Sequence, residues 1–381
     1  MTMQSKSLEV RKIVDRRTLN DFIGVVDDIY RGCRQYVPDM ESDVREFFDA
    51  RKNPGLEFSD VQGFVAYRGG KAVGRIIGIV NHKANERWHT RNVRFSMIEF
   101  VDDLAVSGAL LDAVAQWGRQ RGMTALQGPM GITDFDKEGM LVEDFQLEGS
   151  MSAIYNPPYY PCHMEEHGLT KETDWLQIRI RVPAEVPARY ARTSQYVREQ
   201  MGLRIKKLTR MELLHGGYVK KVFDLLNAAY APIFGFSELS ARQADDFVEK
   251  YIHVLDLQLI PLVVNEQDEV VGIAITIASM NRALQKSRGR LWPLGWYHLL
   301  KSLKVQHEDH AEMLLVAVRP DYQGLGVNAL FFDDLVPVYQ SYGFTWAETG
   351  PQLEDNIREL SQWKPLKPQF VKRRRCYKKT I

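Results

Sequence analysis

The chain has 381 residues, more than one hydrophobic core usually serves, so we expect two domains. Apolar residues make up 45% and charged residues 26% of the sequence, which excludes a collagenous or wholly disordered protein. The 50 basic and 49 acidic residues give a net charge of +1, which provides no overall field to attract nucleic acid. We therefore expect a folded protein without a nucleic-acid partner.

The cysteines and the hydropathy pattern indicate the cellular compartment in which the protein is expected. Cys33, Cys162 and Cys376 are far apart in the sequence, which argues against a disulfide framework and for a reducing environment. Residues 1–17 lack the apolar run of a signal peptide, and no stretch approaches the roughly 18–20 apolar residues of a spanning helix. These patterns predict a cytoplasmic protein, with contact at the inner face of the membrane left open.

Two similar halves follow from self-comparison of the sequence, with matching elements close to 200 residues apart. Each half opens with a short strand, continues with two helices, and reaches a β-hairpin marked by a glycine turn. In the first half we expect a strand at 8–13, helices at 17–30 and 41–51, and a hairpin at 64–80. In the second half we expect a strand at 203–208, helices at 218–230 and 241–251, and a hairpin at 262–277.

After its hairpin, each half continues with a strand, a helix, a strand, a helix and a last strand. This order predicts an α+β or mixed α/β fold, not the strict alternation of a doubly wound sheet. Each domain is expected to be a mixed, mostly antiparallel sheet with flanking helices. We expect domains at 1–183 and 203–381, a linker at 184–202 with a polar helical pattern, and an aromatic and basic insertion at 281–310 in the second domain.

One loop of the second half carries chemistry. The predicted strand 311–318 runs into residues 319–328 and then into a predicted helix at 329–342. Gly324 and Gly326 allow backbone N–H groups to converge at the N-terminus of this helix, where the helix dipole favours an anion. The pattern predicts a pyrophosphate ligand, and a purely structural glycine turn is the alternative.

The loop Gln323-Gly324-Leu325-Gly326-Val327-Asn328 resembles the Gln/Arg-x-x-Gly-x-Gly/Ala motif of the GCN5-related N-acetyltransferase (GNAT) superfamily, with Asn328 as a departure at the last position. Asn356 matches the family's Asn that opens a helix near the pantetheine arm, while Trp363 replaces its following Tyr. The resemblance implies two tandem GNAT-like domains and acetyl-CoA or a longer acyl-CoA as co-substrate. It implies donor binding by Val316, Val318, Gln323, Gly324, Leu325, Gly326, Val327, Asn328 and Asn356.

The same resemblance implies a general base. Glu312 lies on the strand that enters the loop, where several GNAT enzymes hold the carboxylate that deprotonates the acceptor amine. A partly buried Glu with a raised pKa suits this task, whereas a solvent-exposed Glu at the strand edge is the alternative. His307 and His310 are alternative bases. We expect no metal, because two His and two carboxylates in a polar loop are usually solvated.

The first half lacks the loop, because its residues 95–108 run almost directly into the next helix and Gly108 alone cannot form a phosphate cradle. We interpret this half as a degenerate GNAT-like domain without a pyrophosphate site. Residues 226–236, 156–160 and 291–296 further resemble tandem GNAT-like proteins of the bacterial ceramide synthase type, which implies a long-chain base or another lipidic amine as acceptor. The alternative is an inert tandem domain that binds a CoA species or a protein partner.

Aromatic and basic side chains gather in residues 291–304 of the insertion. Trp292, Trp296 and Leu300 are spaced to share one face of a helix, with Lys301 and Lys304 close by. This composition favours contact with a membrane surface. The alternative is a core helix with the same three side chains buried. Acyl length, acceptor identity and oligomeric state do not follow from the sequence.

Overall fold

The computed structural model describes residues 7–252 and 255–381, so part of the N-terminal stretch without a signal-peptide pattern lies outside the described residues. The chain divides into two compact units. Unit 1 comprises Met1–Trp175 and Lys372–Ile381, and unit 2 comprises Leu176–Val371. The expected domain boundaries at 183 and 203 follow the sequence repeat, whereas these units follow the strand pairing.

Unit 1 is built on a mixed sheet with the strand order β1-β2-β3-β4-β5-β14. The β4–β5 pair is parallel, and the other four pairs are antiparallel. Its elements are β1 (Leu8–Lys12), α1 (Arg16–Ile29), α2 (Glu41–Phe47), η1 (Pro54–Glu57), β2 (Ser59–Arg68), β3 (Lys71–Asn81), α3 (His82–Arg87), β4 (Asn92–Phe100), α4 (Leu104–Arg119), β5 (Ala125–Gly128), β6 (Met140–Leu141), α5 (Tyr159–Glu166), the start of β7 (Thr170–Arg181) and most of β14 (Gln369–Thr380).

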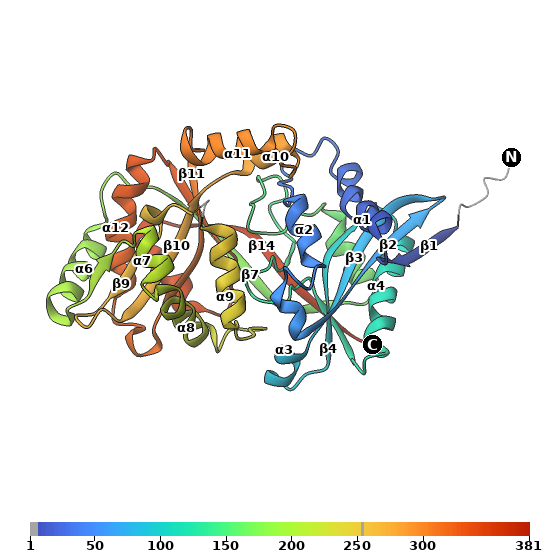
Figure 1. Cartoon of the computed structure of the whole chain (residues 1–381), viewed down its shortest axis with the longest axis horizontal. Coiled ribbons are helices and arrows are strands. Elements are labelled where there is room, and N and C mark those ends of the chain that lie inside the picture. Colours follow the sequence, from blue (N-terminus) through green and yellow to red (C-terminus); the bar gives the residue numbers. More distant parts are fainter. Residues whose placement is uncertain (1–6, 253–254) are drawn as a thin grey trace. The chain divides into compact units, whose positions relative to one another are not determined.

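Both faces of this sheet are buried. Side chains alternate along a strand, so Ile76 and Val80 of β3 pack in the cluster that includes α4, whereas Ile77 and Ile79 pack with Phe22 of α1. The continuous apolar run of β3 is explained by this burial on two sides. Figure 1 shows α1 and α4 covering the strands of unit 1.

Unit 2 repeats the plan with the strand order β7-β12-β11-β10-β9-β8, in which β11 and β12 are parallel. Besides the end of β7, its elements are α6 (Ala188–Met201), β8 (Arg204–Lys206), α7 (Arg210–His215), α8 (Tyr218–Tyr230), α9 (Ala241–Tyr251), η2 (Leu257–Leu259), β9 (Leu262–Val264), β10 (Val270–Ala278), α10 (Asn281–Ser287), α11 (Gly295–Lys304), β11 (His310–Val318), η3 (Pro320–Tyr322), α12 (Asn328–Ser341), β12 (Trp346–Thr349), β13 (Gln352–Leu353), α13 (Ile357–Gln362) and η4 (Lys364–Leu366).

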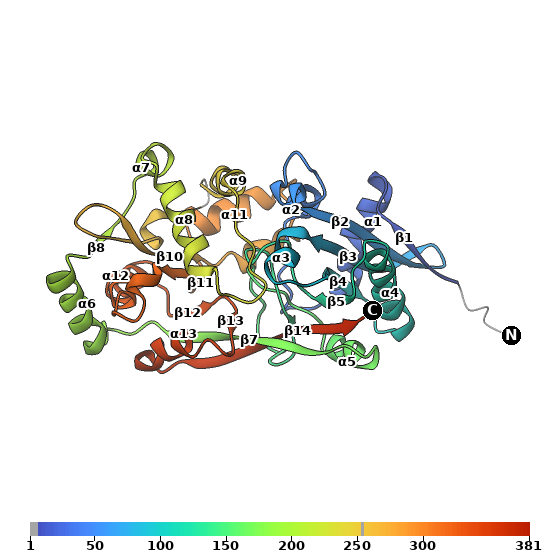
Figure 2. The same ribbon diagram turned by 90° about the horizontal axis from the view of Figure 1, so that it is seen from below.

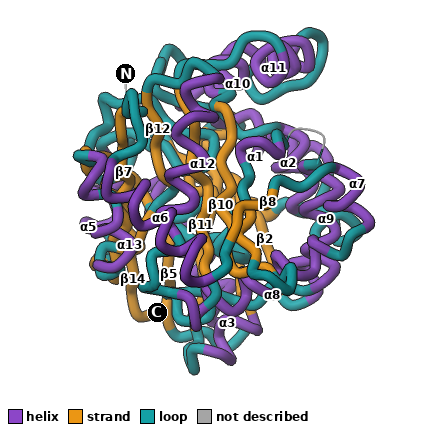
Figure 3. Tube along the Cα trace, turned by 90° about the vertical axis from the view of Figure 1, so that its left-hand side faces the viewer, coloured by secondary structure: helices purple, strands orange, loops and turns teal. Residues whose placement is uncertain are grey.

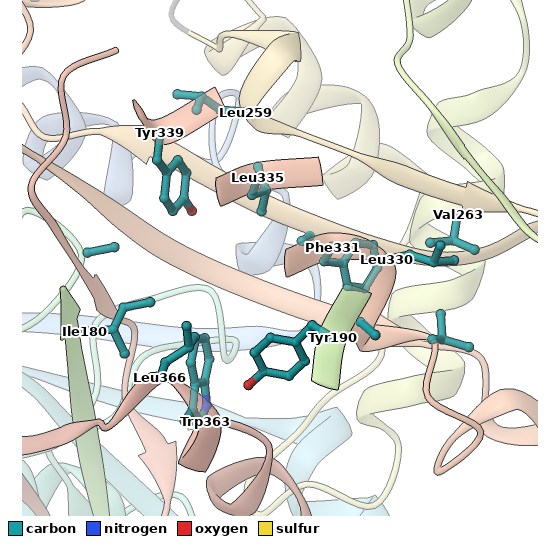
Figure 4. Packing of buried hydrophobic residues seen from close by; sticks show 14 of the residues in the cluster. Ile180, Tyr190, Leu259, Val263, Leu330, Phe331, Leu335, Tyr339, Trp363 and Leu366 are labelled. Carbon is teal, nitrogen blue, oxygen red and sulfur yellow. The ribbon is translucent and has the colours of Figure 1, made fainter. Parts of the chain in front are cut away.

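Residues of the expected linker belong to the core of unit 2. They form α6, which lies beside α12 (Figures 2 and 3). Tyr190 and Val197 of α6 are buried in the same cluster as Leu330 and Phe331 of α12. Figure 4 shows Tyr190, Leu330 and Phe331 in this cluster. The polar pattern of this helix reflects its exposed side only, so α6 is a structural part of unit 2.

The last strand of each half completes the sheet of the other half's unit. In unit 2, β7 pairs antiparallel with β12, with Arg181 opposite Trp346. In unit 1, β14 pairs antiparallel with β5, with Tyr377 opposite Gly128. The two halves of the sequence are therefore not the two units of the structure.

The predicted mixed, mostly antiparallel sheets with flanking helices are confirmed in both units. Helices α8 and α9 have the predicted bounds. The insertion differs, because α11 begins at Gly295 and not at residue 291. Pro293 explains the late start, since the residue before a proline is disfavoured in the helical conformation.

Candidate functional site

The site predicted from sequence lies along β11 of unit 2. Strands β11 and β12 pair in parallel only from His310 opposite Trp346 to Met313 opposite Thr349. The amide of Gly350 then donates to the Met313 carbonyl at 2.8 Å. Beyond this point β11 pairs with β10 alone, and its residues 314–316 are half-buried. The two parallel strands therefore part in the middle of the sheet and leave one edge of β11 without a strand partner.

The glycine loop follows the C-terminal end of β11. Gly324 and Gly326 have φ values of +80° and +87°, a backbone conformation that favours glycine. Among the residues that the structure describes, none accepts a hydrogen bond from the backbone N–H of Gly324, Gly326, Val327 or Asn328. These donors lie at the start of α12, whose dipole favours an anion. The loop fits the pyrophosphate of a CoA thioester.

Other predicted donor-site residues shape the loop. The Gln323 side chain donates to the Val318 carbonyl at 2.9 Å, which ties the loop to the end of β11. Leu325 is exposed, whereas Val327 is buried in the core cluster of unit 2. The Val316 carbonyl accepts a hydrogen bond from the Tyr230 hydroxyl at 3.0 Å, which connects the unpaired part of β11 to the end of α8.

Helix α6 packs directly on the loop. A Cβ atom at Gly326 would lie 2.6 Å from Cγ2 of Thr193, so this glycine permits a close helix contact. Near the first turn of α12, the Asn328 side chain donates to the Gln362 side chain at the end of α13. Tyr190 stacks on Phe332 at 4.4 Å between ring centroids. Polar and aromatic contacts thus connect α6, α12 and α13 beside the loop.

A polar cluster covers one face of β11 and its neighbouring strands. Glu312 and Glu348 are opposite each other on β11 and β12, and both are at least 96% buried, with exposures of 3% and 4%. Arg179 of β7 donates to one oxygen of Glu348 from Nε at 3.0 Å and from Nη2 at 2.7 Å. Gln177 donates to its other oxygen at 3.2 Å. Glu348 is therefore held as an ion pair.

His310 and His307, the two alternative candidates for the general base, lie in different surroundings. His310 lies two residues from Glu312 on β11, stacks on Trp346 at 3.8 Å, and faces Asp309 through Nδ1 at 3.2 Å. Burial lowers the pKa of His310, so the imidazole is neutral at pH 7. His307 lies instead against Tyr342, and its Nδ1 faces the Ser302 carbonyl. The structure brings Glu312 and His310 together but not His307.

Asn356 caps α13, because its side chain accepts a hydrogen bond from the Glu359 amide at 3.3 Å. Its role near a pantetheine arm stays a prediction. Trp363, at the position of the family's Tyr, is buried in the core cluster and offers no acidic hydroxyl.

In unit 1, the strand that corresponds to β11 is β4, and its buried polar side chain is bound by other side chains of the unit. Glu99 of β4 accepts hydrogen bonds from the hydroxyls of Tyr30 at 2.6 Å and Tyr160 at 2.9 Å. Arg75 of β3 lies 3.9 Å from its other oxygen. Burial raises the pKa of Glu99 to about 7. All four side chains are buried, so this network is a closed polar core.

Several residues of the site were not predicted. Glu348 had a usable signal, because parallel strands on either side of a loop and helix bring residues at the same level together. Trp346 shared this signal, since it lies opposite His310 on β12, whereas Arg179 and Gln177 had none, since β7 comes from the other half of the sequence. Within the described ranges, no group of three or more His, Cys, Asp or Glu side chains is placed to hold a metal ion. No described helix has the length and apolar character to cross a membrane.

Comparison with known proteins gives relatives of similar length. No family model matches the chain. Protein YghO of Escherichia coli (strain K12) is 24% identical over 384 residues, which cover 98% of this chain and 95% of that protein. The bacterial ceramide synthase of Caulobacter vibrioides (strain NA1000 / CB15N) is 27% identical over 276 residues, which cover 72% of this chain and 70% of that protein.

Solved structures agree on the fold. A tandem GNAT protein from the clavulanic acid biosynthesis pathway superposes with a TM-score of 0.58 at 12% identity, covering 98% of both chains. A GCN5-related N-acetyltransferase from Sphaerobacter thermophilus superposes with a TM-score of 0.53 at 12% identity, covering 98% of this chain and 95% of that one. The predicted tandem GNAT fold is confirmed, and the relative named bacterial ceramide synthase supports the predicted acyltransferase class.

Proposed function

We propose that this chain, whose fold is that of the tandem GNAT proteins, transfers an acyl group from acyl-CoA to an amine in unit 2. The layout of β11 carries the proposal. Backbone N–H donors that find no acceptor among the described residues follow its C-terminal end, and the buried Glu312 lies near its N-terminal end. From Glu312 to Val318 the strand covers roughly 20 Å at about 3.3 Å per residue. The extended arm of an acyl-CoA, which carries the thioester, can span a distance of this order.

The donor binds by its pyrophosphate at the loop 323–328, where backbone N–H groups and the N-terminus of α12 offer positive partial charge. Its arm follows the edge of β11 that lacks a strand partner, past Val318 and Val316. This edge presents backbone amides that hydrogen-bond the amide groups of the arm, as a strand would.

Glu312 acts as the general base. The amine gives a proton to the Glu312 carboxylate, its lone pair forms a C–N bond with the thioester carbonyl carbon, and the C–S bond breaks to release CoA as thiolate, which is protonated to the thiol. We assign the role to Glu312 because Glu348 is already held by Arg179 and Gln177. His310 is a neutral neighbour on the same strand and the second candidate.

The acceptor is a lipidic amine, such as a long-chain base. The sequence relative named bacterial ceramide synthase supports this choice, since it covers 72% of the chain. A small soluble amine is the other acceptor class, and the two differ in whether the product partitions into lipid.

A second candidate is an inert tandem domain that binds a CoA species or a protein partner. The contacts beside the loop favour it, because the Asn328–Gln362 hydrogen bond and the Tyr190–Phe332 stack fill space between α6, α12 and α13. The buried Trp363, in place of the family's Tyr, also favours it.

Calorimetry with acetyl-CoA and palmitoyl-CoA, followed by release of CoA thiol over a panel of amines that includes sphinganine, tests the proposal. We expect binding of at least one donor and thiol release that depends on an amine. Binding without release for every amine would favour the inert domain. No binding of either donor to the folded protein would overturn acyl transfer and leave only an inert domain that binds a protein partner.

A further inference from the structure

An exposed apolar surface lies on the insertion of unit 2. We name residues 281–306, which include α10 and α11, the insertion segment (Figure 1). Trp292 is 80% exposed, Leu294 61%, and Trp296 44%. Leu291, Tyr297, Leu300 and Val305 are exposed as well. Apolar side chains scattered singly on a surface are ordinary, but seven within fifteen consecutive residues form a patch that marks an interaction site.

The patch is held on a firm support. The buried Ser302 of α11 donates to the Ser279 carbonyl at 3.3 Å, and Gly295 at the start of α11 packs against the backbone of Arg290 so closely that no side chain would fit. The Glu308 carboxylate accepts from the backbone amide of Arg282 at 2.8 Å and from the Ser279 hydroxyl at 3.0 Å. These contacts fix one side of α10 and α11, so the exposed side is presented by folded structure.

The charge of the insertion segment is one-sided. It contains six Lys or Arg residues and no Asp or Glu, although the whole chain has a net charge of only +1. Within the part of the chain that the structure describes, no carboxylate lies within ion-pair distance of Lys286, Arg288, Lys301 or Lys304. On α11, Lys301 and Lys304 lie among the exposed Tyr297 and Leu300. The segment therefore combines apolar and aromatic side chains with four cations, Lys286, Arg288, Lys301 and Lys304, that have no carboxylate partner among the described residues.

We propose that the insertion segment docks the protein onto the surface of a bilayer that contains anionic phospholipid. Tryptophan and tyrosine suit the boundary between headgroups and acyl chains, because each has an apolar ring and a polar edge. The cations meet the negative lipid headgroups at the same depth. The Trp296 indole already donates to the Pro293 carbonyl at 3.1 Å, so its N–H does not oppose insertion of the ring.

Charge favours a lipid surface over a second copy of the chain. In a symmetric dimer the same patch faces itself, so Lys286, Arg288, Lys301 and Lys304 of one copy would meet the same four cations of the other with no acidic residue in either segment. The docking does not depend on acyl transfer, and its test reads binding only. Its failure would therefore leave the proposed function standing.

Flotation of the full chain with vesicles tests the inference. We expect co-flotation with phosphatidylcholine vesicles that contain phosphatidylglycerol, weak binding to pure phosphatidylcholine, and loss of binding as salt rises. The double variant Lys301→Glu/Lys304→Glu should weaken binding by at least about 25-fold, since each surface cation contributes roughly fivefold. Trp292→Ser should also weaken it, and Trp fluorescence of the wild type should shift to the blue on binding.

Matched controls lie elsewhere on unit 2. Tyr196→Ser removes an aromatic side chain that is 60% exposed on α6, and Lys220→Glu reverses an exposed cation on α8. Both should bind vesicles like the wild type. The inference is overturned if the wild type does not float with anionic vesicles, or if all four variants bind equally. Dimerisation at micromolar concentration that Trp292→Ser abolishes would instead assign the patch to a second copy.

Discussion

The junctions β4–α4 of unit 1 and β11–α12 of unit 2 occupy the same place in similar folds, since Phe100 and Val318 pair with the matching glycines of their hairpins. In unit 1, Asp103 caps α4 and accepts from the Ala105 amide at 3.0 Å. In unit 2, no side chain caps α12. A carboxylate at a helix N-terminus satisfies its N–H groups and repels phosphate, whereas the uncapped junction leaves its N–H groups without a side-chain acceptor.

The strands before these junctions differ in the same way. Unit 1 has Glu99 bound by Tyr30, Tyr160 and Arg75. Unit 2 has the small Ala317 at the matching register, and Tyr230 donates to the backbone of β11. At this junction unit 1 thus pairs a strand carboxylate and the helix N-terminus with its own groups, whereas in unit 2 the described residues leave backbone donors of the loop without an acceptor. The difference teaches that the same junction of one fold is closed or accessible to a ligand according to which polar groups have protein partners.

Loss of the proposed base should give the largest effect. Glu312→Gln nearly preserves the side-chain shape but removes the proton acceptor, so kcat should fall by roughly 10²–10⁴-fold with an unchanged Kd for acyl-CoA. The deficit should shrink at high pH, where more amine is neutral. Steady-state kinetics and calorimetry measure the two quantities. An unchanged kcat across the pH range would move the role to His310.

The closed network of unit 1 should show in the pH dependence of stability. Burial raises the pKa of Glu99 from 4.5 to about 7, so the folded state binds its proton more tightly than the unfolded chain. The contribution of this proton to the free energy of unfolding is fully present below about pH 4.5. It is lost as the pH rises through 7, by roughly 3 kcal/mol in total. Glu99→Gln should remove this part of the pH dependence of urea unfolding. The exposed Glu166→Gln on α5 is the control, and equal behaviour of the two variants would contradict the closed network.

The loop glycine should couple stability to donor binding. Gly326→Ala places a side chain at positive φ, which costs about 1–2 kcal/mol, and presses on Thr193 of α6, so acyl-CoA affinity should fall as the loop shifts. Thr193→Ser removes the contacting methyl group and should restore part of the stability. Gly108→Ala in unit 1, whose Cβ would lie 2.9 Å from His167, should reduce stability without changing acyl-CoA affinity. If both glycine variants change affinity alike, unit 2 does not hold the donor.

The helix cap should give the smallest effect. Asp103→Ala leaves the first turn of α4 without its side-chain acceptor and should lower the free energy of unfolding by about 1 kcal/mol. Acyl-CoA affinity should not change, because the donor loop belongs to the other unit. Denaturant titration and calorimetry check both statements, and a change in affinity would place a donor site at α4.

Much of the fold was predictable because local patterns specify it. The hairpins of both halves and helices α8 and α9 follow from periodicity and glycine turns in the sequence. The exchange of β7 and β14 was not predictable, because the sequence of a single strand does not specify which sheet the strand joins. The sequence predicts a linker at α6 because the polar face of this helix dominates its pattern, while Tyr190 and Val197 are buried.

The candidate site likewise has a part that follows from local sequence patterns and a part that does not. The glycine loop is a local motif, so its residues were found together. The polar cluster around Glu312 depends on the register between strands that are distant in the sequence, as with Arg179 beside Glu348. Exposure of Trp292 and Trp296 was an open alternative, because a helical spacing of apolar residues fits a core face and a membrane face equally well.

The exchanged strands impose an order on folding during the synthesis of this protein. While the ribosome makes the first half, one edge of β5 has no strand neighbour, because β14, which supplies the backbone partners of Gly128 and Gln127, is translated only after unit 2. Until β14 has been translated, unit 1 has an open strand edge, which is prone to pairing with other chains. A premature stop codon before β14 would therefore damage the unit that is translated first.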